Sequence, residues 1–146
     1  MKKTILILSS LLFLTGISEG KEVTYLQDRG GVKYEVNSEV GFTGRLVEKY
    51  ENGQKEKEEN YRNGELDGLV TLWYENGQMN YDGNYKNGSK DGLQIWWYEN
   101  GKKKNERVFK NGKLQGLTTG WYGNGQKQFE NNYKNGKLNG LTTSWY

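Results

Sequence analysis

The feature that most constrains this chain is a pentapeptide that returns every 24 residues. Tyr-Glu-Asn-Gly-Gln occupies residues 50–54 and 74–78, close variants occupy residues 98–102 and 122–126, and Tyr146 stands in the same phase. A second Asn-Gly pair recurs at the same interval, at residues 63–64, 87–88, 111–112 and 135–136. Self-similarity at a fixed period of this size indicates a repeat architecture. We expect four complete units between Gly44 and Asn139 and a terminal half unit after them.

Each unit is predicted to hold two antiparallel strands. Asn-Gly between β-prone segments is a strong hairpin signal, because a type I′ turn needs positive φ at both central residues. No apolar pattern of helical period is present, and glycine recurs too often for helices. The fold class is therefore predicted to be all-β, an elongated single-layer antiparallel meander built from 24-residue hairpin units.

The Asn76-Gly77 pair predicts a register for the second unit. A two-residue turn at this pair makes four cross-strand pairs: Glu75 with Gln78, Tyr74 with Met79, Leu72 with Tyr81 and Gly68 with Tyr85. The segment 86–92 is then predicted to be a longer connection between units.

Repetition turns single aromatic residues into columns, and two of these form the candidate interaction surface. Its members are Trp73, Trp97, Trp121, Trp145, Tyr74, Tyr98 and Tyr122. Rings on both sides of a single-layer sheet cannot all be buried within one chain, and large exposed apolar patches mark interaction sites. The competing interpretation of the tryptophans is packing within the sheet, since large rings that cover neighbouring strands contribute to stability.

Glycines recur in the turns and opposite ring positions, where we predict a structural role. Turns of this kind need positive φ, and a glycine opposite a ring leaves a floor on which the ring lies. The predicted structural glycines are Gly53, Gly64, Gly68, Gly77, Gly88, Gly92, Gly101, Gly112, Gly116, Gly125, Gly136 and Gly140.

Composition excludes several kinds of site. The chain has no cysteine and no histidine, which excludes disulfides, Cys or His zinc sites, and Ser-His or Cys-His nucleophile pairs. A net charge of +3 is too small to indicate nucleic acid or an anionic membrane as the main partner. The acidic column of Glu58, Asp82, Glu106 and Glu130 has neighbours about 9–10 Å apart, too far for paired-carboxylate chemistry, and is predicted to be a solvated face. We predict no enzyme activity and no catalytic, cofactor-binding or metal-binding residue.

The first twenty residues predict export. Lys2 and Lys3 precede an apolar run from Ile5 to Leu14, and small residues follow, a pattern typical of a secretory signal peptide over residues 1–20 with cleavage after Ser18 or Gly20. The mature protein is then expected in the periplasm or outside the cell, without a lipid anchor because it has no cysteine. Residues 21–43 do not fit the repeat and are predicted to form a capping segment with a β-hairpin, its strands at 23–26 and 32–36, before the array at 44–146.

Residues 81–92, Tyr-Asp-Gly-Asn-Tyr-Lys-Asn-Gly-Ser-Lys-Asp-Gly, resemble the MORN repeat. The 24-residue unit is similar to the bacterial MORN-variant repeat, and this resemblance covers residues 42–146. Only the second unit carries the full pattern, with Tyr81 and Gly83. The other units place different residues there: Lys57 and Glu59, Asn105 and Arg107, and Phe129 and Asn131. The resemblance implies an elongated, exposed antiparallel sheet that serves as a binding or spacing module.

The sequence is compatible with three functions. The first is an exported, non-catalytic module for protein–protein interaction or scaffolding, whose partner is an unknown protein or a second copy of the chain. The second is an antitoxin or immunity-type MORN-variant protein, for which an export signal would have no use. The third is a glycan-binding surface protein in which Trp97 and Trp121 stack on sugars.

Overall fold

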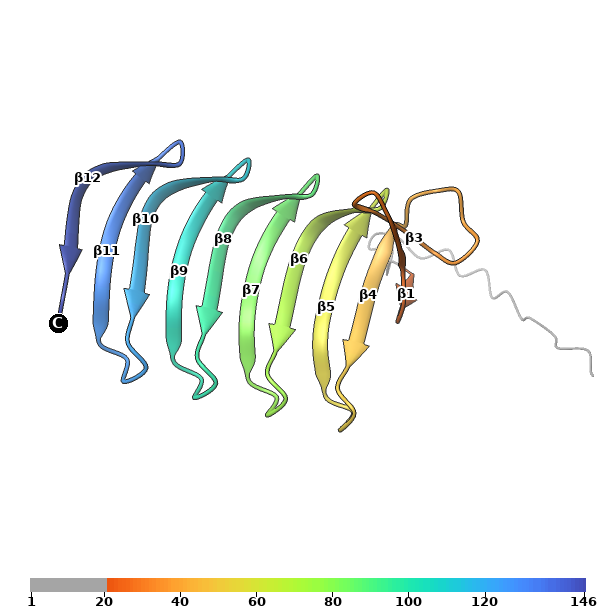
Figure 1. The fold of residues 1–146 in the computed structure, drawn as a ribbon, viewed down its shortest axis with the longest axis horizontal. Helices are drawn as coiled ribbons and strands as arrows, with labels where there is room; N and C mark the ends of the chain where they lie inside the picture. Colours follow the sequence, from red (N-terminus) through yellow and green to blue (C-terminus); the bar gives the residue numbers. More distant parts are fainter. Residues whose placement is uncertain (1–20) are drawn as a thin grey trace, which may run out of the picture.

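The computed structural model describes residues 21–146, which contain twelve strands and no helix (Figure 1). The predicted signal peptide lies outside the described residues. The strands are β1 (Glu22–Val23), β2 (Gln27–Arg29), β3 (Val32–Tyr34), β4 (Gly44–Lys49), β5 (Lys55–Arg62), β6 (Glu65–Trp73), β7 (Met79–Lys86), β8 (Ser89–Trp97), β9 (Lys103–Lys110), β10 (Lys113–Trp121), β11 (Lys127–Lys134) and β12 (Lys137–Ser144).

Ten of these strands form one sheet that follows the chain from β4 to β12 in sequence order, with β1 added in parallel beside β4. All neighbours from β4 onward are antiparallel, and the sheet is a single layer extended along the array (Figure 1). The prediction of an all-β meander of hairpin units is confirmed.

The tight hairpin turns are at the second Asn-Gly pair of each unit. Asn87 and Gly88 both have positive φ, 46° and 72°, and Lys86 pairs directly with Ser89 across the turn. This is the geometry of a type I′ turn, and the same signs recur at residues 63–64, 111–112 and 135–136. The prediction of a longer connection over residues 86–92 is therefore wrong, because β8 resumes at Ser89.

The repeated pentapeptide forms the longer loop at the opposite edge of the sheet. The Gly77 amide donates to the Tyr74 carbonyl at 2.9 Å, the Tyr74 amide donates to the Gln78 carbonyl at 2.8 Å, and Asn76 does not have positive φ. Its side chain instead accepts a hydrogen bond from the Gln78 amide at 3.0 Å, the arrangement of an Asx turn. The predicted turn at Asn76-Gly77 is wrong for this reason.

The register that followed from that turn is right in two of its four pairs, and Gln78 bonds to Tyr74 rather than to Glu75. Leu72 pairs with Tyr81 and Gly68 pairs with Tyr85, as predicted. Met79 pairs with Trp73 rather than with Tyr74, because a bulge at the start of β7 shifts the register by one residue. Met79 therefore shares a face with the tryptophan column, whereas the predicted register had placed it on the other face.

The even-numbered strands from β6 onward bend near their starts, as Figure 1 shows. The bend in β6 falls at Gly68, where four residue steps from Leu66 to Val70 are opposed by two steps from Tyr61 to Glu59. Gly68 has φ of 119°, a conformation that side-chain-bearing residues rarely adopt. All twelve glycines predicted to be structural have positive φ.

A small apolar core lies where the N-terminal segment meets the first unit. Its buried members are Leu26, Phe42, Leu46 and Tyr61, with Val23 and Leu66 packed against them. In the capping segment, the hairpin pairs β2 with β3 through the Gly30-Gly31 turn. Its first strand thus begins at Gln27, after the predicted 23–26 segment, because Leu26 is buried in the core and residues 22–23 pair with β4 instead.

Candidate interaction surfaces

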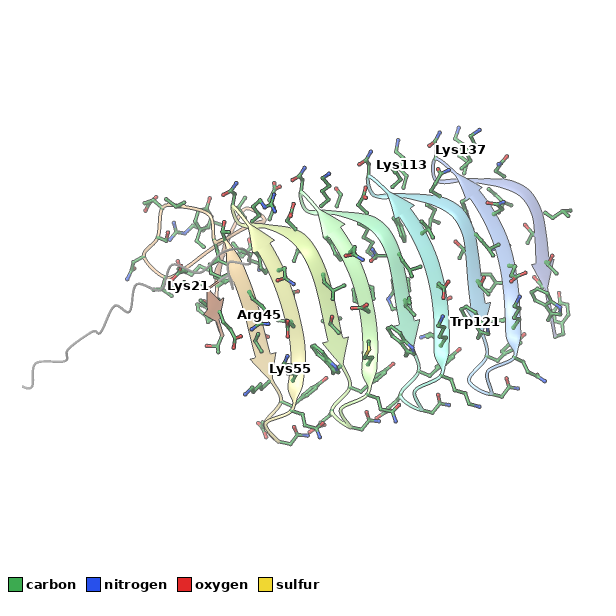
Figure 2. The ribbon with its side chains drawn as sticks, turned by 180° about the vertical axis from the view of Figure 1, so that it is seen from behind. Lys21, Arg45, Lys55, Lys113, Trp121 and Lys137 are labelled. Atoms are coloured by element: carbon green, nitrogen blue, oxygen red, sulfur yellow. The ribbon has the colours of Figure 1, made fainter. Side chains whose placement is uncertain are left out.

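Cross-strand pairing assigns the repeated columns to two faces of the sheet. The Trp face carries the columns of Trp73, Trp97, Trp121 and Trp145 and of Leu69, Leu93, Leu117 and Leu141. The Tyr face carries Tyr61, Tyr81, Tyr85, Trp96, Phe109, Phe129 and Tyr133. The tryptophans lie toward the loop edge, as Trp121 does in Figure 2, and Lys113 and Lys137 lie at the type I′ turn edge.

On the Trp face, three tryptophans are each covered by a lysine of the preceding strand. The Lys55 Nζ atom is 5.4 Å from the ring centroid of Trp73, and the same lysine pairs with Glu58 at 2.6 Å (Figure 2 labels Lys55). Equivalent groups recur twice: Lys103 with Trp121 and Glu106, and Lys127 with Trp145 and Glu130. The acidic column was predicted to be solvated, but these three carboxylates are partly buried and ion-paired, because the lysine that covers each ring also reaches the glutamate.

The second unit departs from this pattern. Met79 stands where the other units have the covering lysine, and Asp82 stands in the glutamate column and accepts a hydrogen bond from the Thr71 hydroxyl at 2.8 Å. Among the described residues, no cation lies over the ring of Trp97. This tryptophan is therefore the one in its column without a charged neighbour on its ring within residues 21–146.

Two further departures follow on the same face. Ile95 stands where the first unit has Val47 and the later units have Thr71, Thr119 and Thr143, and Val108 stands where the other units have Asn60, Asn84 and Asn132. Val108 pairs with Leu93 across β8 and β9, and Ile95 lies between Leu93 and Trp97 along one side of β8. We call Met79, Leu93, Ile95, Trp97 and Val108 the central apolar patch. Met79, Leu93 and Val108 are 37%, 40% and 37% exposed.

The tyrosines of the candidate surface hold successive units together at the loop edge. The Tyr98 hydroxyl donates to the Trp121 carbonyl at 2.9 Å, and Tyr50, Tyr74 and Tyr122 make the equivalent bond to Trp73, Trp97 and Trp145. Burial and the charge of Glu99 raise the pKa of the Tyr74 phenol. Asn76 adds a bond from its side-chain amide to the Glu99 carbonyl at 3.1 Å, and Asn52 and Asn100 repeat it. These polar groups are engaged within the array, so only the ring faces of Tyr74, Tyr98 and Tyr122 are available to a partner.

The Tyr face of the third unit holds a polar cluster that the predicted columns did not include. Gln94 is fully buried, and its amide nitrogen donates to the Asn84 carbonyl at 2.7 Å while its oxygen bonds to the Tyr81 hydroxyl. Burial and the hydrogen bond to Tyr85 raise the pKa of Tyr81. Lys90 and Arg107 flank Trp96 on this face. The sequence signal for this cluster is that its residues differ from those at the same positions of other units. Lys90, for example, interrupts a column that holds Phe42, Leu66, Leu114 and Leu138.

The model of the MORN repeat variant matches residues 42–63, 66–87, 90–111 and 112–135, four consecutive repeats that cover more than half of the chain. The chain belongs to the MORN repeat variant family. The resemblance stated from the sequence is thereby confirmed. No curated protein matches the chain.

MORN repeats are in general interaction or scaffold modules, and the family is in general non-catalytic. In this MORN-variant array, no group of three or more His, Cys, Asp or Glu side chains within residues 21–146 is placed to hold a metal ion. Across the same range, no helix is long and apolar enough to cross a membrane.

Proposed function

We propose that this MORN-variant protein is an exported, non-catalytic interaction module that binds a protein partner through the central apolar patch. The observation that carries the proposal is the coincidence of three departures from the repeat. Met79 and Val108 each replace a residue that is polar in the other units, and Ile95 replaces the threonine found in every unit after the first, where Val47 stands. All three lie on one face of neighbouring strands, and units without them form the same hairpins, so the fold does not require apolar side chains at all three positions together.

The surroundings of the patch fit a protein interface. Interfaces have an apolar centre and a polar rim, and aromatic residues and methionine are enriched at their centres. Trp97 and Met79 are in the patch, and the ion pairs Lys55–Glu58 and Lys103–Glu106 flank it on either side along the array. Each flanking pair is neutral as a whole, and Asp82, which pairs with Ile95 across β7 and β8, adds one further carboxylate to the rim. Large rings bury ~150–250 Å² each, so covering Trp97 and its neighbours is a substantial source of affinity.

The test restores the polar residue that the other units carry at each position. A triple variant, Met79→Lys, Ile95→Thr and Val108→Asn, keeps the repeat and removes the patch. We expect its thermal unfolding to stay close to that of the wild type. Cross-linking followed by mass spectrometry should place a partner on residues 79–108 of the wild type and lose it in the variant. Lys110→Gln, at the turn edge, is the matched control and should retain the cross-links.

Sedimentation over a concentration series distinguishes the two kinds of partner. A dimer that forms in the wild type and is lost in the triple variant identifies a second copy of the chain as the partner. A wild type that stays monomeric directs the search to a foreign protein. Equal binding by wild type and triple variant, in either assay, contradicts the proposal.

Export is the second part of the proposal and is supported by the pattern of residues 1–20. Cell fractionation with N-terminal sequencing of the purified protein tests it. The expected result is a chain that begins at Glu19 or Lys21 outside the cytoplasm. An uncleaved chain in the cytoplasm contradicts export and favours the antitoxin or immunity alternative.

A further inference from the structure

Two cations of the third unit lie against the same ring on the Tyr face. The Lys90 Nζ atom is 5.1 Å from the ring centroid of Trp96, and the Arg107 Cζ atom is 5.3 Å from it. Lys90 is also 5.8 Å from the ring of Tyr81 and 5.4 Å from that of Phe109. Rings attract cations, but they offer no lone pair to a hydrogen-bond donor. The donors of both side chains are thus left for another group.

No carboxylate of the described chain neutralises these cations. Neither Lys90 nor Arg107 takes part in an ion pair within residues 21–146. Beyond β6, Asp82, Glu106 and Glu130 are on the Trp face, Asp91 binds the Asn111 amide at the turn edge, and Glu99 is in a loop. Burial, and to a smaller degree the charge of Arg107, lowers the pKa of Lys90. Two like charges therefore share a partly buried place without a counter-ion.

Three buried polar atoms beside the cations have no hydrogen-bond partner among residues 21–146. They are the Arg107 Nε, the Thr118 Oγ1 and the Asn131 Oδ1. Arg107 pairs with Thr118 and Thr118 pairs with Asn131, so the three residues form one row across β9, β10 and β11. Thr118 is 4% exposed. Because buried polar groups in native proteins nearly always have partners, three in one row indicate a ligand that supplies them.

The fold does not require these cations. The column of Lys90 holds leucine in three other units, and the column of Arg107 holds Gly83 in the second unit and Asn131 in the fourth. Each cation has a cost here, since charges on a partly buried face lose solvation. Their presence at the one place where they meet is therefore explained better by binding than by packing.

We propose that Lys90 and Arg107 bind a side-chain carboxylate of an acidic, extended peptide, with the Trp96 ring as the floor of the site. A carboxylate accepts two hydrogen bonds from an arginine at once and is also the usual counter-ion of lysine. An extended peptide presents such a carboxylate together with backbone hydrogen-bonding groups, which inorganic phosphate lacks. This site is on the face opposite the central apolar patch and does not depend on the function proposed above.

The experiment is calorimetric titration of the full chain with a capped hexaglutamate peptide at low salt. Lys90→Leu and Arg107→Asn restore residues of other units, so both variants should fold. Each should weaken binding roughly tenfold or more, the loss expected for a hydrogen-bonded charge pair. Lys127→Met, which removes a cation from the Trp face at the position where the second unit has Met79, is the matched control and should bind like the wild type. The thermal midpoint of Lys90→Leu should equal or exceed that of the wild type, because an unpaired charge has been removed.

Several results overturn the proposal. These are no heat of binding, equal binding by wild type and both variants, or equal weakening by Lys127→Met. A large fall in the thermal midpoint of Lys90→Leu would show that Lys90 serves packing. Two further probes test the ligand class: inorganic phosphate and trigalacturonate should both bind more weakly than the peptide. If either binds more tightly, the site takes that oxyanion or an acidic glycan instead. Since none of these variants alters the patch, failure here leaves the partner proposal standing.

Discussion

The two ends of the sheet are built from the same repeat but are held by different interactions. At the N-terminal end, Phe42 and Leu46 are 2% and 3% exposed beneath the capping segment, which also adds β1 to the sheet. At the other end, every residue of β12 is exposed, and Leu138 and Leu141 are 55% and 89% exposed. The equivalent positions Phe42 and Leu138 thus differ in burial because, within residues 21–146, the capping segment packs against the first of them and no other segment covers the second.

The difference also appears within a single row of the Tyr face. Leu46 and Val70 are buried apolar residues of that row, and Gln94, Thr118 and Asn131 continue it with polar side chains. The repeat supplies backbone pairing and the Tyr-to-Trp hydrogen bonds to every unit alike. The capping segment adds a closed apolar core to the first unit. In a repeat protein, where stability is a sum of units and of their nearest-neighbour contacts, this predicts a gradient along the array.

The largest test of that gradient compares one column at its two ends. Phe42→Ala empties a site in the closed core and should lower the free energy of unfolding by about 3–5 kcal/mol. Leu138→Ala, in the same column, should lower it by less than about 1 kcal/mol, because more than half of that side chain is already exposed. Urea unfolding followed by tryptophan fluorescence measures both. Similar losses at the two positions would show that the ends are equally packed.

A smaller effect is expected at the loop edge. Tyr98→Phe removes the hydrogen bond to the Trp121 carbonyl in a partly buried setting and should cost about 1 kcal/mol of unfolding free energy. Tyr122→Phe removes the equivalent bond to Trp145, which is exposed, and should cost about half as much or less because water replaces the lost donor. Both substitutions keep the ring, so thermal melting compares the hydroxyls alone. A larger cost at Tyr122 would reverse the proposed gradient.

The sequence predicted those parts of the fold whose signals recur in every unit. The period and the β-propensity were sufficient for the meander and for the Leu72–Tyr81 pair. They were insufficient for the turns, because each unit contains two Asn-Gly pairs of equal local merit. In three of the four loops the Asn side chain also binds a carbonyl of the next unit, as Asn76 binds that of Glu99, and such contacts between units are not visible in the local sequence.

The candidate sites were harder to predict for the opposite reason. The recurring columns predicted the tryptophans and tyrosines as the interaction surface, but many of these recurring residues hold neighbouring units together. Lys90, Gln94 and Arg107 occur once each in their columns, so a search for repetition passes over them. Their significance needed the cross-strand register, which brings residues of different strands onto one face. In a repeat array, a residue that differs from the rest of its column indicates a site when residues beside it on the same face also differ from theirs.

The smallest expected effect is a loss of stability at low pH through Glu58. Partial burial raises the pKa of Glu58, but Lys55 and Arg45 together lower it further, so it lies below its ordinary value of 4.5. A carboxylate with a lowered pKa adds stability above the pKa of the unfolded chain, and this stability is lost as the pH falls through the folded value.

The wild type should therefore lose up to about 1 kcal/mol through Glu58 as the pH falls below about 4.5, a small amount because the pair is partly solvated. Glu58→Gln should lack this part of the acid dependence in urea unfolding at a series of pH values. Glu106→Gln, at the same column position in the third unit, is the matched control, since its carboxylate has Lys103 alone as a partner among the described residues. Arg45 (labelled in Figure 2) pairs with both Glu22 and Glu58 and links the first unit to β1. If the cap stabilises its end of the sheet by ion pairing as well as by packing, Glu58→Gln should remove more of the acid-dependent loss of unfolding free energy than Glu106→Gln does. Equal effects of the two variants would show that the ends differ in apolar burial alone.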